Sequence, residues 1–131
     1  VIAALPAFAI IRDAVLGISS NPLISLSVAV NAIAGITGSA SGGMSIALAA
    51  MADTFIANAN AANIPMEVLH RVASMASGGM DTLPHNGAVI TLLAVTGLTH
   101  KVAYKDIFAI TLIKTSAVFA IIATYYLTGL V

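Results

Sequence analysis

The residues best suited to chemistry in this sequence lie in one short stretch, SGGMDTLPHNG, residues 77–87. It holds a carboxylate, Asp81, and an imidazole, His85, with Pro84 between them. Proline removes a backbone donor and clashes with the preceding turn, so the stretch is expected to interrupt a helix. A carboxylate and an imidazole side by side can pass on a proton near neutral pH. We therefore predict that Asp81 and His85 are proton-coupling residues, which bind and release a proton as the protein works. The alternative is structural, with Asp81 capping backbone N–H groups and His85 bonded to a carbonyl.

The pentapeptide ASGGM occurs twice, at residues 40–44 and 76–80, and both copies lie at an expected helix break. A helix that begins inside a membrane leaves unpaired N–H groups and a partial positive charge at that end. Glycine admits a ligand close to the backbone, and serine adds hydrogen bonds. We predict a carboxylate-binding site made of Thr37, Ser39, Ser41, Gly42, Gly43, Ser77, Gly78, Gly79, Thr82 and Asn86. At residues 77–79, which end a helix, carbonyl groups favour a cation instead. Close helix packing explains Gly42 and Gly43 equally well.

The composition indicates an integral membrane protein. Hydrophobic residues make up 60% of the chain, charged residues 8%, and mean hydropathy is +1.05. Residues 14–52 carry no charge, a run longer than the ~20 residues of one membrane crossing. We expect several membrane crossings. Zero net charge without a basic stripe argues against nucleic acid as a partner. The absence of cysteine and the spacing of the histidines predict no metal or other cofactor, and no catalytic motif supports an enzyme.

Residues 22–59 are expected to form a helical hairpin. The sequence TGSASGG, residues 37–43, is poor in helix formers, and a break there leaves two arms of roughly fifteen residues. Each arm would be about 22 Å long, too short for ~30 Å of hydrocarbon. We therefore predict a re-entrant hairpin whose polar tip lies within the membrane, where protein or water must surround it. Asn31 in the first arm is expected to hydrogen bond between helices.

Residues 65–98 are expected to form a discontinuous transmembrane helix. A break at 77–86 leaves two arms of about 18 Å, which together make about 36 Å, one tilted crossing. Broken helices of this kind form substrate and ion sites in secondary transporters.

The remaining segments set the expected topology. A basic loop at 99–106 precedes a last transmembrane helix, 107–130, whose Lys114 is expected to reach the headgroups. The positive-inside rule places that loop in the cytoplasm and residues 60–63 outside. Residues 1–20 are expected to form an interfacial or partial transmembrane helix. Because the chain starts at Val1 in an apolar run, we expect a fragment of a longer chain that has lost its N-terminal part.

The stretch DTLPHNGAV, residues 81–89, within SGGMDTLPHNGAVITLLAVTGLTHKVAYKDIF, resembles the C-terminal part of the gluconate permease (GntP-type) family. The segment NAIAGITGSASGGMSIAL resembles the block before it. This resemblance implies half of an inverted-repeat, ion-transporter-like fold that takes up gluconate or a related small organic carboxylate with protons. Its implied partners are the bilayer and the N-terminal remainder of the permease. A homodimer, in which a second copy of the chain is a partner, stays open. Sodium coupling, an ion antiporter or channel without an organic substrate, and a non-transporting membrane subunit remain open.

Overall fold

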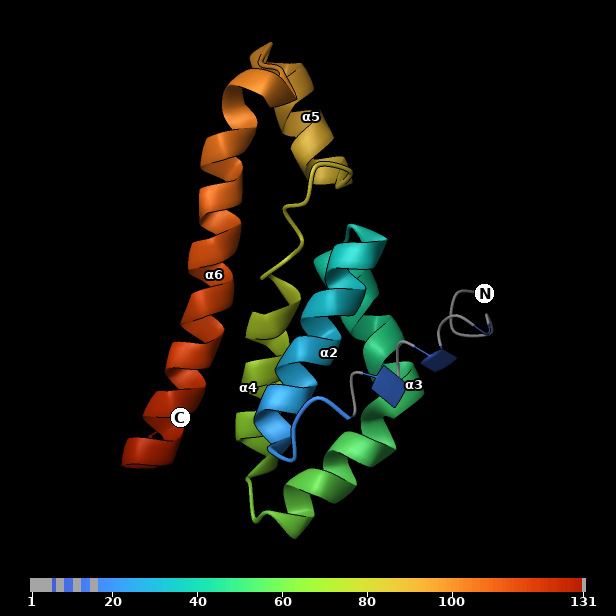
Figure 1. The fold of residues 1–131 in the computed structure, drawn as a ribbon, viewed down its shortest axis with the longest axis vertical. Coiled ribbons are helices and arrows are strands. Elements are labelled where there is room, and N and C mark those ends of the chain that lie inside the picture. Colours follow the sequence, from blue (N-terminus) through green and yellow to red (C-terminus); the bar gives the residue numbers. More distant parts are fainter. Residues whose placement is uncertain (1–5, 7–8, 11–12, 15–16, 131) are drawn as a thin grey trace.

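The structure, a computed structural model, describes residues 6, 9–10, 13–14 and 17–130 (Figure 1). The segment predicted at 1–20 therefore lies largely outside the described residues. From residue 17 on, the chain forms helices and no strand, so the predicted all-α class is confirmed. The helices are α2 (Pro22–Thr37), α3 (Ala40–Ala61), α4 (Met66–Ser77), α5 (Gly87–Thr96) and α6 (His100–Thr128).

Helices α2 and α3 form the predicted hairpin, but the turn between them is shorter than expected. Gly38 ends α2 with a φ of 62°, a left-handed conformation that favours glycine. Ser39 then begins α3, and its Oγ accepts the N–H of Gly42 at 3.1 Å. The prediction of a non-helical segment over 37–43 is therefore wrong except at Gly38 and Ser39. Thr37 belongs to α2, and Ser41, Gly42 and Gly43 lie in the first turn of α3.

The second arm of the hairpin is also longer than predicted. Helix α2 has 16 residues, whereas α3 has 22, or about 33 Å of helix. Helices α3 and α6 are both long and apolar enough to cross a membrane. The argument that both arms are too short to cross thus holds for α2 alone. Re-entry of the hairpin into the membrane stays a prediction.

The predicted break in the next helix is confirmed. Helix α4 ends at Ser77 and α5 begins at Gly87, so residues 78–86 form a non-helical linker, one residue shorter than the predicted break. The linker leaves the end of α4 and rises past the hairpin turn to α5 (Figure 1).

Helix α6 begins earlier than predicted, because residues 100–106 are helical rather than a loop. Only residues 97–99 connect it to α5. Lysine and alanine are good helix formers, so the basic residues of this segment do not oppose a helix. Helix α6 has 29 residues and runs back along the whole molecule (Figure 1). Near its end, Tyr126 Oη donates to Asn21 Oδ1 at 3.1 Å, beside the start of α2.

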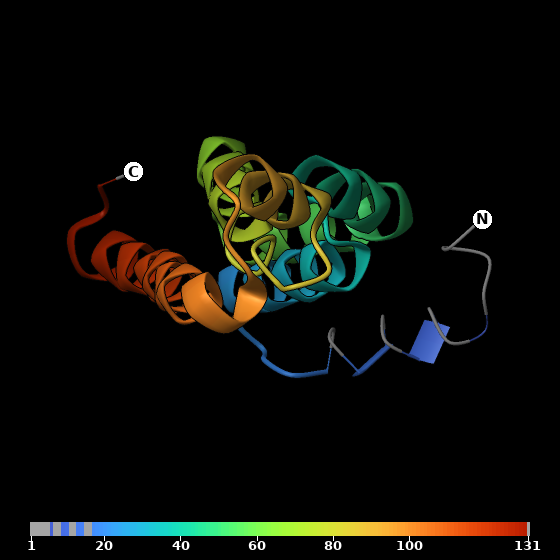
Figure 2. The same cartoon turned by 90° about the horizontal axis from the view of Figure 1, so that it is seen from above.

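The core is centred on α2, which packs against α3, α4 and α6. Leu23, Leu26 and Val30 of α2 are fully buried. Viewed from above, α6 lies to one side of the α2–α3–α4 group (Figure 2). Helix α5 buries only Val89 and Leu93. The apolar surfaces of α5 and α6 are thus largely uncovered, as expected for helices that face lipid or other membrane helices.

Candidate functional site

The linker between α4 and α5 is held against α2 at its beginning. Asn31 of α2 is buried, and its Oδ1 accepts the N–H of Met80 at 2.7 Å. A Cβ added to Gly79 would overlap the Asn31 amide, so glycine is needed for this approach. Asn31 was expected to hydrogen bond to another helix; it does bond to a distant segment, but its partner is the backbone of the non-helical linker.

The end of the linker is held by the C-terminal end of α2. His85 Nε2 lies 2.9 Å from the carbonyl oxygen of Gly35, and Asn86 Nδ2 donates to the carbonyl oxygen of Gly38 at 2.6 Å. A Cβ on Gly38 would lie 3.1 Å from His85 Cδ2. His85 thus makes the carbonyl contact of the structural alternative. The hairpin turn and the helix break form one polar cluster.

Two helices, α3 and α5, begin in this cluster. The anion site predicted from the sequence requires such helix N-termini. At α5, Asn86 Oδ1 accepts the N–H groups of Ala88 at 2.6 Å and Val89 at 3.4 Å. At α3, Ser39 Oγ accepts that of Gly42. The chain's own side chains therefore already bind three of the N–H groups available at these ends. Carboxylate binding there stays a prediction.

An ion pair joins the middle of the linker to α6. Lys114 Nζ donates to Asp81 Oδ1 at 2.6 Å, across 33 positions of the sequence. Because α6 begins at His100, Lys114 lies midway along this helix. The expectation that it extends to the headgroups near the start of a shorter helix is wrong. Asp81 and His85 have separate partners, and among the described residues no hydrogen bond joins them.

Helix α6 also binds the linker at two further levels. Thr82 Oγ1 and Thr111 Oγ1 are 2.5 Å apart, and Tyr104 Oη donates to the carbonyl of Thr82 at 3.4 Å. Nearer the start of α6, His100 Nε2 lies 3.0 Å from the carbonyl oxygen of Pro84. The sequence reasoning missed Lys114 and Thr111 as site residues. The usable signal was a lysine in the middle of an apolar helix, since an ionisable group at membrane depth is costly and usually functional.

The other predicted site residues divide into two groups. The hydroxyls of Thr37 and Ser77 donate to backbone carbonyls of their own helices, those of Ile33 at 2.9 Å and Ser74 at 2.8 Å. Gly43 is buried where a Cβ would overlap the backbone of Ala34. It therefore serves the close packing that was the alternative explanation.

In the second group, the side chain of Ser41 is exposed and Gly42 lies beside Ser39. Gly78 is half-buried at the end of α4, where its N–H donates to the carbonyl of Met75 at 3.2 Å. The contacts of these three residues neither support nor oppose a role in ligand binding, which stays a prediction.

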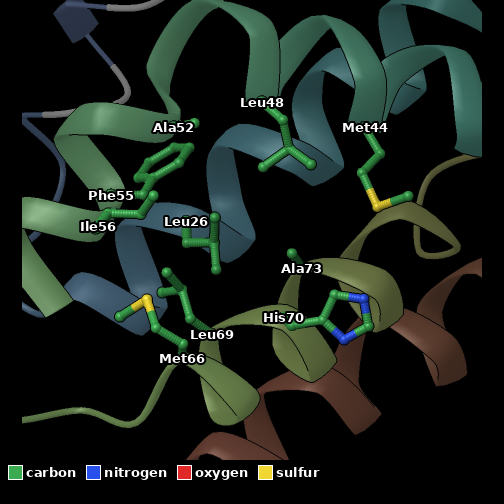
Figure 3. A pocket seen from close by; sticks show the side chains of 10 residues that line it. All are labelled: Leu26, Met44, Leu48, Ala52, Phe55, Ile56, Met66, Leu69, His70 and Ala73. Carbon is green, nitrogen blue, oxygen red and sulfur yellow. The ribbon is translucent and has the colours of Figure 1, made fainter.

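A separate apolar cavity of about 260 Å³ lies among α2, α3 and α4 (Figure 3). Leu26, Phe55 and His70 are among its lining residues, and none of the predicted site residues is. In the part of the chain that the structure describes, no three histidine, aspartate or glutamate side chains gather as a metal site would require. The polar cluster of the linker is therefore the candidate site.

Comparison with known proteins supports a membrane transporter class. The whole chain is similar, at 65% identity over 131 residues, to a protein of Bacillus subtilis (strain 168) described as "Uncharacterized transporter YxjC". The chain spans 28% of that relative's length. No family model matches the sequence, so the resemblance to gluconate permeases stays a prediction. No solved structure matches it either.

Proposed function

We propose that the chain is part of a secondary active transporter that takes up gluconate or a related small organic carboxylate together with protons, in a bacterial cytoplasmic membrane. The observation that carries the proposal is the Asp81–Lys114 ion pair at the break between α4 and α5. An ion pair midway along an apolar helix needs a reason, because charges are costly at membrane depth. A carboxylate that can gain and lose a proton, beside a cation that can attract an anion, provides one.

Three further observations support the class and the substrate. The similar Bacillus subtilis protein is described as a transporter. Discontinuous helices typically form the substrate and ion sites of secondary transporters, and here the helix break bonds to the hairpin turn through Asn86. The DTLPHNGAV stretch, which carries the resemblance to gluconate permeases, forms the second half of the linker and the start of α5. The substrate class rests on this resemblance.

The test is counterflow of labelled gluconate in liposomes that hold the full-length parent protein. We expect entry of label when the liposomes are preloaded with unlabelled gluconate, and accumulation when a pH gradient, acid outside, is imposed. Accumulation driven by a sodium gradient instead would favour sodium coupling. Ion flux without any exchange of gluconate or of related sugar acids would contradict the proposal and favour an antiporter or channel. Empty liposomes provide the background.

A further inference from the structure

We propose that Lys114 is the residue that binds the substrate's carboxylate, and that Asp81 forms an ion pair with Lys114 when no substrate is bound. A proton on Asp81 releases the lysine, and the anion takes its place. This inference rests on the proposed function and deepens it, since it assigns one residue to the anion and one to the proton.

The geometry of the pair fits such an exchange. Among the described residues, the ammonium of Lys114 has one hydrogen-bond partner, Asp81 Oδ1 at 2.6 Å. An ammonium group has three donors, so two remain for a ligand. The side chains of Lys114 and Asp81 are 35% and 25% exposed, so neither partner encloses the other and part of the lysine surface is open to a ligand. One turn earlier in α6, the buried Thr111 hydroxyl bonds that of the half-buried Thr82, the residue after Asp81, so α6 holds the linker in place beside the pair.

No other charged group competes at this position in the described part of the chain. Helices α2 and α5 have no acidic or basic side chain, and Asp53 of α3 is exposed. The ionisable side chains of α4 are Glu67, His70 and Arg71, which lie in its first half, away from the linker.

Asp13 precedes α2, and Tyr125 and Tyr126 lie in the last turn of α6, about three turns beyond Lys114. The other titratable groups of the described chain belong to the linker and to the first two turns of α6. His85 and His100 bind the carbonyls of Gly35 and Pro84, and the phenol of Tyr104 binds that of Thr82. The other three, Lys101, Lys105 and Asp106, are exposed. Asp81 is therefore the acid in position to control the charge around Lys114.

The charge balance then sets the stoichiometry. In the empty site, one ammonium and one carboxylate sum to zero. Adding an anion alone would leave one uncompensated negative charge at the pair, which is unfavourable at membrane depth. Adding an anion and one proton leaves an ammonium, a neutral carboxylic acid and the bound carboxylate, which again sum to zero. No covalent bond changes; the proton moves from water to an Asp81 oxygen as the ammonium exchanges one carboxylate for another.

The experiment is gluconate binding to the purified full-length protein in nanodiscs, over a range of pH and in weak buffer so that proton uptake can be measured. For the wild type we expect about one proton taken up per gluconate bound and a Kd that rises by about tenfold per pH unit where Asp81 is ionised. For Asp81→Asn we expect tight binding at every pH and no proton uptake. For Lys114→Gln we expect binding weakened by about tenfold to a hundredfold, as for loss of a hydrogen bond to a charged group. Lys105→Gln, which alters an exposed lysine two and a half turns earlier in α6, should bind as the wild type does.

Two results would overturn the inference. One is wild-type affinity in Lys114→Gln; the other is a retained pH slope or retained proton uptake in Asp81→Asn. If Lys114→Gln is not recovered as a folded protein, Asp81→Asn decides the question by itself, because it leaves the lysine in place. If the wild-type protein exchanges gluconate but the variants give either of these results, the inference is refuted and the proposed function stands. A wild-type protein that neither binds nor exchanges any sugar acid refutes the proposed function, and the inference with it.

Discussion

At the residue scale, small side chains let polar groups come close enough to hold the site together. Gly79 is buried beside the amide of Asn31, whose Oδ1 accepts the N–H of the next residue, Met80. Asn31 is itself buried in the most enclosed helix of the molecule. A buried amide must find partners, because a buried unsatisfied polar group costs about 1–3 kcal/mol. The start of the linker is therefore fixed by one hydrogen bond and one missing Cβ.

We expect Gly79→Ala to lower the stability of the full-length protein by about 1–3 kcal/mol, because the new methyl group must displace Asn31. The measurement is thermal unfolding of the detergent-purified protein. Gly87→Ala is the matched control, since a Cβ there meets nothing within 4 Å. Equal melting temperatures for the two variants would contradict this account of Gly79.

The charged residues show why part of the site was beyond sequence reasoning. Asp81 and His85 stood out because two ionisable groups flank a proline between two apolar segments. Their partners did not, because Asp81 meets Lys114 across 33 positions and His85 meets Gly35 across 50. No local spacing encodes such contacts, which arise only when α2 and α6 pack against the linker. The same limit led to the expectation that Lys114 reaches lipid headgroups.

At the element scale, side-chain caps decide where helices begin. Glycines and serines that weaken an isolated helix made 37–43 seem a long break. In the structure Ser39 caps α3 at once, and Gly43 sits inside the helix because α3 approaches the backbone of Ala34. The break at 78–86 was predictable, since it contains Pro84 and the glycines at 78 and 79, and none of these residues begins a helix or packs inside one. Propensity alone does not separate these two cases; packing does.

Asn86 is the cap of α5 and also its bond to the hairpin turn. Asn86→Ala removes the acceptor for two N–H groups and the donor to Gly38, so we expect α5 to lose about 0.5–2 kcal/mol of local stability. Hydrogen exchange of the amides of residues 88–90 should be faster by the corresponding factor of about 2–30. Asn86→Asp keeps the acceptor and should exchange at a rate between those of the wild type and Asn86→Ala. Ser39→Ala, which removes the cap of α3, is the control for a general loss of structure. Unchanged exchange in Asn86→Ala would refute the capping role.

At the scale of the whole molecule, the helices define two ends. The α3–α4 connection lies at one end with the C-terminus of α6, and the α5–α6 connection lies at the other (Figure 1). If the membrane lies between these two ends of the molecule, residues 60–63 and Lys101 are on opposite sides of it. The positive-inside rule assigns Lys101, at the start of α6, to the cytoplasm, even though its segment is helical rather than a loop.

We therefore expect Lys101→Cys to be labelled only from the cytoplasmic side and Asn60→Cys only from outside, with membrane-impermeant thiol reagents on intact cells and inverted vesicles. This chain has no cysteine of its own, so it adds no background. Labelling of both positions from the same side would contradict the predicted topology. Labelling with the two sides exchanged would contradict the orientation while keeping the crossing.

The central claim is that Asp81 couples a proton to the carboxylate substrate, and uptake driven by a pH gradient tests it most directly. Liposomes holding the full-length wild type or Asp81→Asn are given labelled gluconate with an acid exterior, and counterflow is measured on the same preparations. Asparagine keeps the size of the side chain but cannot release a proton. We predict that Asp81→Asn abolishes accumulation against the gradient while counterflow persists, and that His85→Gln shifts the pH optimum only mildly. Accumulation by Asp81→Asn at the wild-type rate would show that Asp81 is not the coupling group.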